Sequence, residues 1–197
     1  MMRTIYMLLV AVLLAGCANP QAADRGNLRS ERHPIRVADV DGKLHAPLTD
    51  STHKASVLIF ITTDCPIANS YAPEIQRLTA EYEPDGIKIY LVHADPDITA
   101  DKAKQHAQEY RHTNTVLLDQ DQALARTTGA TVTPEAAVLS PGGFTLYRGR
   151  IDDSFATYGR RREVVTKTEL RDALDAILQG RPVPVARTEA IGCHIPL

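Results

Sequence analysis

The sequence predicts a single α/β domain in which a central mixed β-sheet carries helices on both faces. Strand and helix patterns alternate along residues 55–128, which favours parallel strands joined by crossover helices. A hairpin signal at residues 141–143 and a final amphipathic helix follow, and the hairpin adds antiparallel strands to the sheet. The chain has 197 residues, of which 44% are hydrophobic and 23% are charged. This length and composition fit one globular domain and exclude a disordered chain or a coiled coil.

The strands are expected where short apolar runs lie between turn residues. Residues 55–62 contain an unbroken apolar run from Val57 to Ile61, which is typical of a strand buried on both faces of a sheet. Residues 141–143 (PGG) favour a tight turn between two antiparallel strands. Further strands are expected at residues 87–92, 115–118, 136–140 and 144–148.

The helices are expected where apolar residues recur at helical spacing. The first such helix carries one apolar stripe and ends before residues 84–86. The stripe consists of Tyr71, Ile75, Leu78 and Tyr82. The last helix carries its stripe over residues 170–178, with a capping-box pattern at residues 166–169 and a stop at Gly180 and Pro182. Further helices are expected at residues 98–110 and 123–128.

Residues 1–16 are predicted to be a lipoprotein signal peptide. Residues 5–15 form an apolar run that is shorter than the ~20 residues a membrane-spanning helix needs. Residues 14–17 (LAGC) resemble the lipobox of bacterial lipoproteins, which implies cleavage before Cys17 and lipidation of that residue. In such proteins Ala18 at the next position favours transfer to the outer membrane. The alternative is an ordinary secretory signal with an incidental cysteine.

The rest of the chain is predicted to consist of a tether, a domain and a tail. Residues 17–34 are polar, as in a flexible linker, the domain spans residues 35–180, and the tail spans residues 181–197. The lipobox places the protein in the bacterial cell envelope, anchored by lipid and facing the periplasm. A formal net charge of −2 gives no global basic field for nucleic acid, so no nucleic-acid partner is expected.

Cys65 is the predicted reactive residue because it lies between the most apolar strand and the first helix. The positive end of a helix dipole and the free N–H groups there favour the thiolate, which is the nucleophilic form. The charge of Asp64 acts in the opposite direction and raises the thiol pKa. The alternative is a buried structural cysteine.

The residues around Cys65 resemble the thioredoxin superfamily. Pro73 matches the proline that kinks the first helix of that family. Residues 129–134 (GATVTP) resemble the loop that holds the cis-proline of the family beside the active cysteine. The resemblance covers roughly residues 35–180 and implies a thioredoxin-like fold, in which Pro134 shapes a substrate groove beside Cys65.

The chain departs from thioredoxins and resembles the redoxin branch, which includes the peroxiredoxins. Ala68 replaces the second cysteine of the C-x-x-C motif, so a dithiol within that loop cannot form, and Asp64 replaces the usual tryptophan. Thr62 matches a threonine of the peroxiredoxins, which implies a hydrogen bond from its hydroxyl to the thiolate or to a peroxide. Leu58 stands at the position of their proline.

Cys193 is the predicted resolving partner of Cys65. The segment from Gln179 to Cys193 reaches at most ~46–50 Å when extended. The last helix is only ~18 Å long, so the tail is able to return to Cys65, and Ile191 and Ile195 give it apolar residues with which to dock. The alternative is a structural clip between the same two cysteines.

The predicted function is that of a membrane-anchored redox protein that reduces disulfides or peroxides through Cys65. Its expected partners are an envelope thiol or disulfide protein, or a small peroxide, and no cofactor is expected. The resemblance to peroxiredoxins also implies an arginine beside the thiolate, for which Arg148 and Arg150 are the candidates.

A second resemblance, to the Sco-type copper chaperones, leaves a different function open. It implies that Cys65, Cys193 and His194 bind copper. Asn69 replaces the second cysteine of the C-x-x-x-C motif of those proteins. A redox-inert envelope scaffold is the third alternative.

Overall fold

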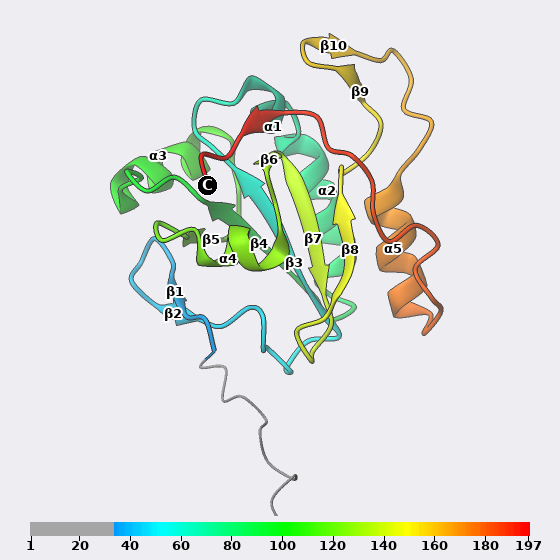
Figure 1. Ribbon diagram of the computed structural model, residues 1–197, viewed down its shortest axis with the longest axis horizontal. Coiled ribbons are helices and arrows are strands. Elements are labelled where there is room, and N and C mark those ends of the chain that lie inside the picture. The colour runs from blue at the N-terminus through cyan, green and yellow to red at the C-terminus, as the bar shows by residue number, and fades with distance from the viewer. Residues whose placement is uncertain (1–33) are drawn as a thin grey trace, which may run out of the picture. The chain divides into compact units, whose positions relative to one another are not determined.

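The computed structural model describes residues 34–197, whose centre is a five-stranded sheet in the order β5–β4–β3–β7–β8 (Figure 1). The strands are β3 (Ala55–Ile61), β4 (Ile87–His93), β5 (Thr115–Leu118), β7 (Glu135–Leu139) and β8 (Thr145–Gly149). β3, β4 and β5 run parallel, whereas β7 is antiparallel to both β3 and β8. The predicted mixed sheet is therefore confirmed.

The central strand β3 is buried along its whole length because both faces of the sheet are covered. Val57, Ile59 and Ile61 belong to the hydrophobic cluster on one face. Leu58 and Phe60, which alternate with them, belong to the cluster on the other face. An unbroken apolar run is thus the pattern that this position requires.

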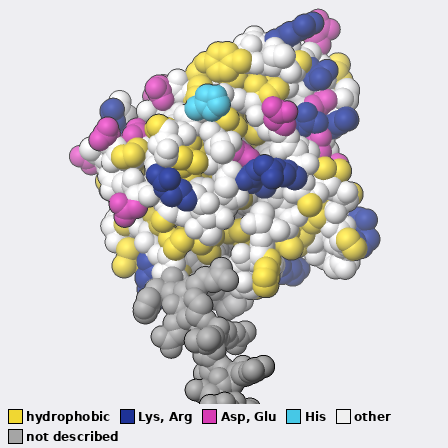
Figure 2. Space-filling view, in the orientation of Figure 1, with side chains coloured by type: hydrophobic (Ala, Val, Ile, Leu, Met, Phe, Trp, Pro, Cys, Tyr) yellow, Lys and Arg dark blue, Asp and Glu magenta, His cyan; other side chains and the backbone are white. Residues whose placement is uncertain are grey.

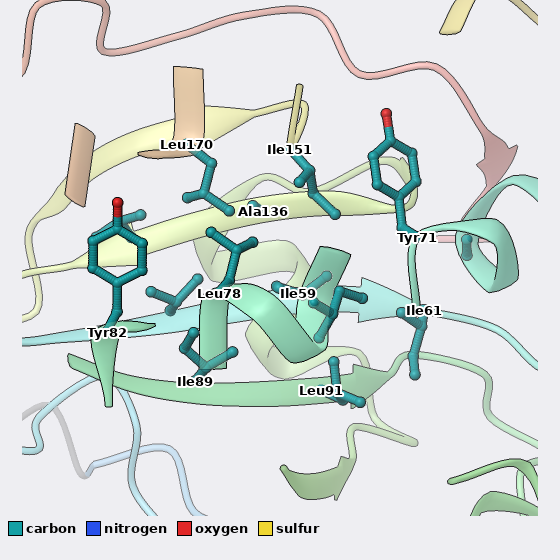
Figure 3. Close-up of a cluster of buried hydrophobic side chains, with 14 of the residues drawn as sticks. Ile59, Ile61, Tyr71, Leu78, Tyr82, Ile89, Leu91, Ala136, Ile151 and Leu170 are labelled. Carbon is teal, nitrogen blue, oxygen red and sulfur yellow. The ribbon is translucent and has the colours of Figure 1, made fainter. Parts of the chain in front are cut away.

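Helices cover both faces, as predicted. α2 (Ala72–Tyr82), α3 (Ala100–Glu109) and α5 (Glu169–Leu178) contribute buried residues to the first cluster, and α4 (Ala123–Thr128) contributes to the second. Figure 3 shows Leu78 of α2 and Leu170 of α5 pointing toward Ala136 of the sheet, in the same cluster as Ile59 and Ile89. The apolar stripes read from the sequence are therefore the faces that these helices bury.

The first predicted helix is divided into two helices at Tyr71. α1 (Pro66–Ser70) ends there, and α2 begins at Ala72 with Pro73 in its first turn. Pro73 thus follows directly after the interruption of this helical segment, in the first turn of α2. Proline is tolerated in a first turn because its missing N–H has no partner there in any case.

The predicted capping box at the start of α5 was wrong. The side chain of Thr168 makes no capping hydrogen bond, and the carboxylate of Glu169 binds the Arg150 guanidinium instead. Asp153 accepts hydrogen bonds from the N–H groups of Thr166 and Lys167, at 2.8 Å and 3.0 Å. A tertiary ion pair and a distant carboxylate thus replace the local capping interaction.

Small two-stranded sheets accompany the central one. Two are local antiparallel pairs that the sequence patterns did not predict: β1 (Val37–Ala38) with β2 (Leu44–His45), and β9 (Phe155–Thr157) with β10 (Arg160–Arg161). The third joins β6 (Val132–Thr133) to β11 (Cys193–His194), which belongs to the tail. Figure 1 draws this tail in red, from α5 past β8 to β6 and α1.

The membrane-related predictions concern residues outside the described part of the chain. Cys17, the signal peptide and nearly all of the tether precede residue 34. Among the residues described, no helix has the length and apolar character needed to cross a membrane. On the face drawn in Figure 2, basic, acidic and hydrophobic side chains of the described residues are interspersed.

We predict that Leu78→Ala lowers the free energy of unfolding by about 2–5 kcal/mol, because Leu78 is fully buried and its loss leaves a cavity between α2 and the sheet. Urea denaturation monitored by circular dichroism measures the change. Leu44→Ala is the matched control, since Leu44 is 57% exposed and its truncation should cost about 0.5 kcal/mol or less. Equal effects of the two substitutions would contradict this assignment of the core.

Candidate functional site

Cys65 sits at the junction of the central strand β3 and helix α1, at the carboxyl end of the sheet. It is the N-cap of α1, and its sulfur accepts a hydrogen bond from the N–H of Ala68 at 3.4 Å. The side chain is completely buried. The junction therefore supplies Cys65 with one of the backbone donors that the sequence predicts.

The loop that contains Pro134 lies directly against Cys65. The Thr133–Pro134 peptide bond is cis, and the Cys65 sulfur lies 3.1 Å from the Thr133 carbonyl oxygen. The Thr133 hydroxyl also hydrogen-bonds the Cys65 side chain and favours its ionised form. The structure thus places Pro134 beside Cys65 and adds Thr133 to the site.

Thr62 is connected to Cys65 indirectly, by way of Thr133. Its hydroxyl lies 3.4 Å from the Thr133 hydroxyl, at the end of the segment that leads from β3 to Cys65. Thr133 is thus placed between Thr62 and the sulfur, because it also contacts Cys65. In this arrangement Thr62 orients the Thr133 hydroxyl.

The tail brings Cys193 to the same place. β11 pairs antiparallel with β6, so that Cys193 lies opposite Thr133 and His194 opposite Val132. Both thiols are free, and the two cysteines lie close enough for each to shift the pKa of the other. The two cysteines, which are far apart in the sequence, therefore form one site.

The environments of the two thiols shift their pKa values in opposite directions. Burial raises the pKa of Cys65, but hydrogen bonds from the Cys193 thiol, the Ala68 N–H and the Thr133 hydroxyl outweigh it, and the net shift is downward. Burial and the neighbouring Cys65 raise the pKa of Cys193 to about 11. Of the two thiols, Cys65 is therefore the one that ionises more readily, and the thiolate is the nucleophilic form.

Tyr158 covers the outer side of the pair. It lies between β9 and β10, is 65% exposed, and places its hydroxyl 3.9 Å from the Cys193 sulfur. This contact lowers the pKa of Cys193, but burial and Cys65 act more strongly in the opposite direction. Tyr158 therefore marks the side of the site that faces solvent.

Asn69 holds the segment that precedes Cys65. Its side-chain amide donates a hydrogen bond to the Thr63 carbonyl oxygen at 3.0 Å. Its carbonyl oxygen lies 2.9 Å from Nε2 of His106, which belongs to α3. The residue at the position of a second cysteine in copper chaperones is here a structural clamp.

The two candidate arginines are engaged elsewhere. Arg148 pairs with Glu135 at 3.3 Å, and Arg150 pairs with Glu169. Both are held by carboxylates of their own neighbourhood, and within residues 34–197 neither guanidinium is a hydrogen-bond partner of the Cys65 sulfur. The interpretation of Arg148 or Arg150 as the arginine of a peroxiredoxin-like site was therefore wrong.

The three-residue copper set does not assemble either. His194 follows Cys193 on β11, and successive side chains of a strand point to opposite faces. His194 accordingly lines a separate hollow together with Glu135 and Arg148. In the described part of the chain, no group of three His, Cys, Asp or Glu residues is placed to hold a metal ion.

Sequence patterns missed three residues of this site. Thr133 was visible only as the neighbour of Pro134, and nothing in the local sequence of Tyr158 relates it to a cysteine. Gly192 gives no turn signal, yet a Cβ atom there would lie 1.9 Å from the Thr133 carbonyl oxygen. Glycine permits the close approach of another backbone, so Gly192 beside Cys193 is the sequence signal that could have predicted this contact.

Comparison with known proteins places the chain in a family. Residues 35–154, more than half of the chain, match the Redoxin family, and the chain therefore belongs to the redoxins. No curated protein is significantly similar to it in sequence.

Solved structures show the fold. An uncharacterized conserved protein from Geobacillus kaustophilus is 30% identical, with a TM-score of 0.73 over 83% of this chain and 88% of its own. A hypothetical protein from Sinorhizobium meliloti is 24% identical, with a TM-score of 0.71 over 82% and 89% of the two chains. A secreted Mycobacterium tuberculosis disulfide oxidoreductase is 16% identical, with a TM-score of 0.53 over 75% and 98%. The predicted thioredoxin-like fold is therefore confirmed.

We predict that Thr133→Val raises the pKa of the Cys65 thiol, because valine keeps the shape of the side chain but removes a hydrogen bond to the thiolate. The thiolate would then form at higher pH than in the native protein. Ultraviolet absorbance of the thiolate, taken as the difference from the corresponding Cys65→Ser protein, measures the titration. Thr131→Val is the control, because Thr131 is exposed and its hydrogen bonds to Glu135 and Ile195 are made by its backbone. An unchanged titration in Thr133→Val would contradict the role assigned to this hydroxyl.

Proposed function

We propose that this redoxin is a thiol-dependent reductase that acts on disulfides through Cys65, with Cys193 as its resolving thiol. The observation that carries the proposal is the pairing of β11 with β6, which brings Cys193 opposite Thr133 and thus beside Cys65. In this site the pKa of Cys65 is lowered and that of Cys193 is raised. A nucleophilic thiolate beside a protonated second thiol is the arrangement that two-step thiol–disulfide exchange requires.

The first step is attack of the Cys65 thiolate on one sulfur of a substrate disulfide. A Cys65–substrate disulfide forms, and the other substrate sulfur leaves as a thiolate. Cys193 then attacks the Cys65 sulfur, forms the Cys65–Cys193 disulfide and releases the second substrate sulfur, which takes up the proton that Cys193 loses. The substrate gains two electrons, and the two cysteines are oxidised together.

A peroxide is the other candidate substrate within the same scheme. Attack of Cys65 on a peroxide oxygen would give a sulfenic acid and release an alcohol or water, and Cys193 would then form the disulfide with loss of water. Disulfides are favoured because neither Arg148 nor Arg150 is free to assist peroxide cleavage. The similarity in fold to a secreted disulfide oxidoreductase is consistent with this choice.

We further propose that the protein acts in the bacterial cell envelope, as a lipoprotein anchored through Cys17 and facing the periplasm, on the outer membrane. The support is the lipobox at residues 14–17 and the polar segment that follows it. Its partners would be an envelope protein that carries a disulfide and a thiol donor that restores the reduced pair. An oxidising compartment also suits a cysteine pair that cycles between thiol and disulfide.

We predict that Cys65→Ser abolishes disulfide reduction, whereas Cys193→Ser permits the first step and stops at the second. With dithiobis(nitrobenzoate) as the substrate, Cys193→Ser should release one equivalent of coloured thiolate and retain the other as an adduct on Cys65. Stopped-flow absorbance and mass spectrometry measure the two products. A Cys193→Ser protein that turns over normally would show that Cys193 is not the resolving thiol.

We predict that the full chain incorporates fatty acid when it is produced in a bacterium, because lipidation of Cys17 follows from the lipobox. Metabolic labelling with an alkyne fatty acid and gel fluorescence measure the modification. Cys17→Ser should lose the label, and the matched control Cys193→Ser should keep it. Label that persists in Cys17→Ser would overturn the lipoprotein assignment without affecting the redox proposal.

A further inference from the structure

The tail is held on the domain at two places, and glycines make both approaches possible. Beside β8, the Arg148 N–H donates to the Ala186 carbonyl oxygen at 2.9 Å, and the Thr188 N–H donates to the Arg148 carbonyl oxygen at 3.0 Å. A Cβ atom at Gly149 would lie 2.1 Å from the Thr188 hydroxyl oxygen. This first attachment fixes the direction in which the tail runs.

The second attachment is the pairing of β11 with β6, beside Cys65. The Ile195 N–H donates to the Thr131 carbonyl oxygen at 2.9 Å, and the Ile195 side chain is buried in the second hydrophobic cluster. The Gln122 side-chain amide donates to the Pro196 carbonyl oxygen at 2.6 Å. Because a Cβ atom at Gly192 would meet the Thr133 carbonyl oxygen at 1.9 Å, this attachment requires glycine at that position.

We call residues 189–197 the strap, and it occupies the strand edge that a substrate would need. An extended peptide binds a sheet edge by adding a strand to it, with its main chain paired to that edge. β6 is the edge beside Cys65, and β11 already pairs with it, placing a cysteine opposite Thr133. With the strap in this position the Cys65 side chain is completely buried.

We propose that the strap is an internal competitor for protein substrates, which opens to admit an extended disulfide-bearing peptide to β6 and expels that peptide when it closes. This inference rests on the proposed function, since it assigns to the same two cysteines the class of substrate that the strap controls. While the substrate is joined to Cys65, closure of the strap returns Cys193 to Cys65. Closure then displaces the peptide from β6 in the same movement that brings Cys193 to attack the substrate-bound sulfur.

The strap is suited to this movement because only one of its side chains is fully buried. Glu189, His194, Pro196 and Leu197 are exposed, whereas Ile195 is the buried residue of the strap. Ile191 packs partly buried against the first cluster, but Ile195 is the one fully buried anchor, so a substitution there loosens the strap and leaves both cysteines in place.

The test measures how fast Cys65 is alkylated in the reduced full-length chain, with Cys17, Cys65 and Cys193 distinguished as separate peptides by mass spectrometry. Ile195→Ala should raise the alkylation rate of Cys65 by iodoacetamide on the order of tenfold, because loss of a buried anchor lowers the cost of opening. A bulky maleimide should show a larger increase than iodoacetamide does. Leu197→Ala is the matched control, since Leu197 is 46% exposed and its truncation should leave the rate unchanged.

Gly192→Ala provides a second variant in case Ile195→Ala impairs folding. It keeps Ile195 and should also raise the alkylation rate of Cys65, because the methyl group prevents close pairing of β11 with β6. Equal Cys65 alkylation rates in the native chain, Ile195→Ala and Gly192→Ala would overturn the proposal.

The choice between a protein substrate and a small one provides a second measurement, which would not change if the strap had only a structural role. Ile195→Ala should react faster with the disulfides of insulin in the first step, and the Cys65–insulin adduct should persist longer than in the native chain. The reaction with dithiobis(nitrobenzoate) should change less. If the native chain reduces neither compound, the proposed function fails, while the alkylation rates still report on the strap. If both compounds respond equally to Ile195→Ala, the strap does not select substrates and the inference fails alone.

Discussion

The pairing of β11 with β6 is the interaction on which the site depends. β3 and α1 place Cys65 at the end of the sheet, and Pro134, between β6 and β7, lies beside it. Without the tail, however, Cys65 would lack the Cys193 hydrogen bond, which is the largest of the interactions that lower its pKa. The pKa of Cys65 in the closed site therefore depends on the docked tail as well as on the junction.

The parts of the fold that could be predicted from sequence are those that local patterns determine. β3 was found because a strand covered on both faces must be apolar throughout, and α2 because a helix that covers a sheet needs one apolar stripe. The position of Cys65 between them follows directly. The break at Tyr71 and the failed capping box lie at helix ends, where tertiary contacts such as the Arg150–Glu169 pair compete with local signals.

The parts that could not be predicted are those that join distant segments. Chain length shows that the tail is able to reach Cys65, but it contains no information about the strand with which the tail pairs. The role of Tyr158 depends on that pairing, because the residue it contacts is Cys193 of β11. The prediction for Arg148 and Arg150 was wrong because it also depended on distant segments, since their partners Glu135 and Glu169 lie on other elements.

The energetics of the second attachment explain how one element serves both as a cover and as a reactant. Burial of a side chain such as Ile195 contributes about 1.5–3 kcal/mol, and each backbone hydrogen bond contributes about 0.5–1.5 kcal/mol. Ordering the backbone of the strap opposes these gains, at a cost of about 1–2 kcal/mol for each residue. A strap much more tightly bound would close Cys65 permanently, and one without Ile195 would seldom present Cys193. An attachment that is able to open is what a resolving thiol needs when it shares its binding edge with the substrate.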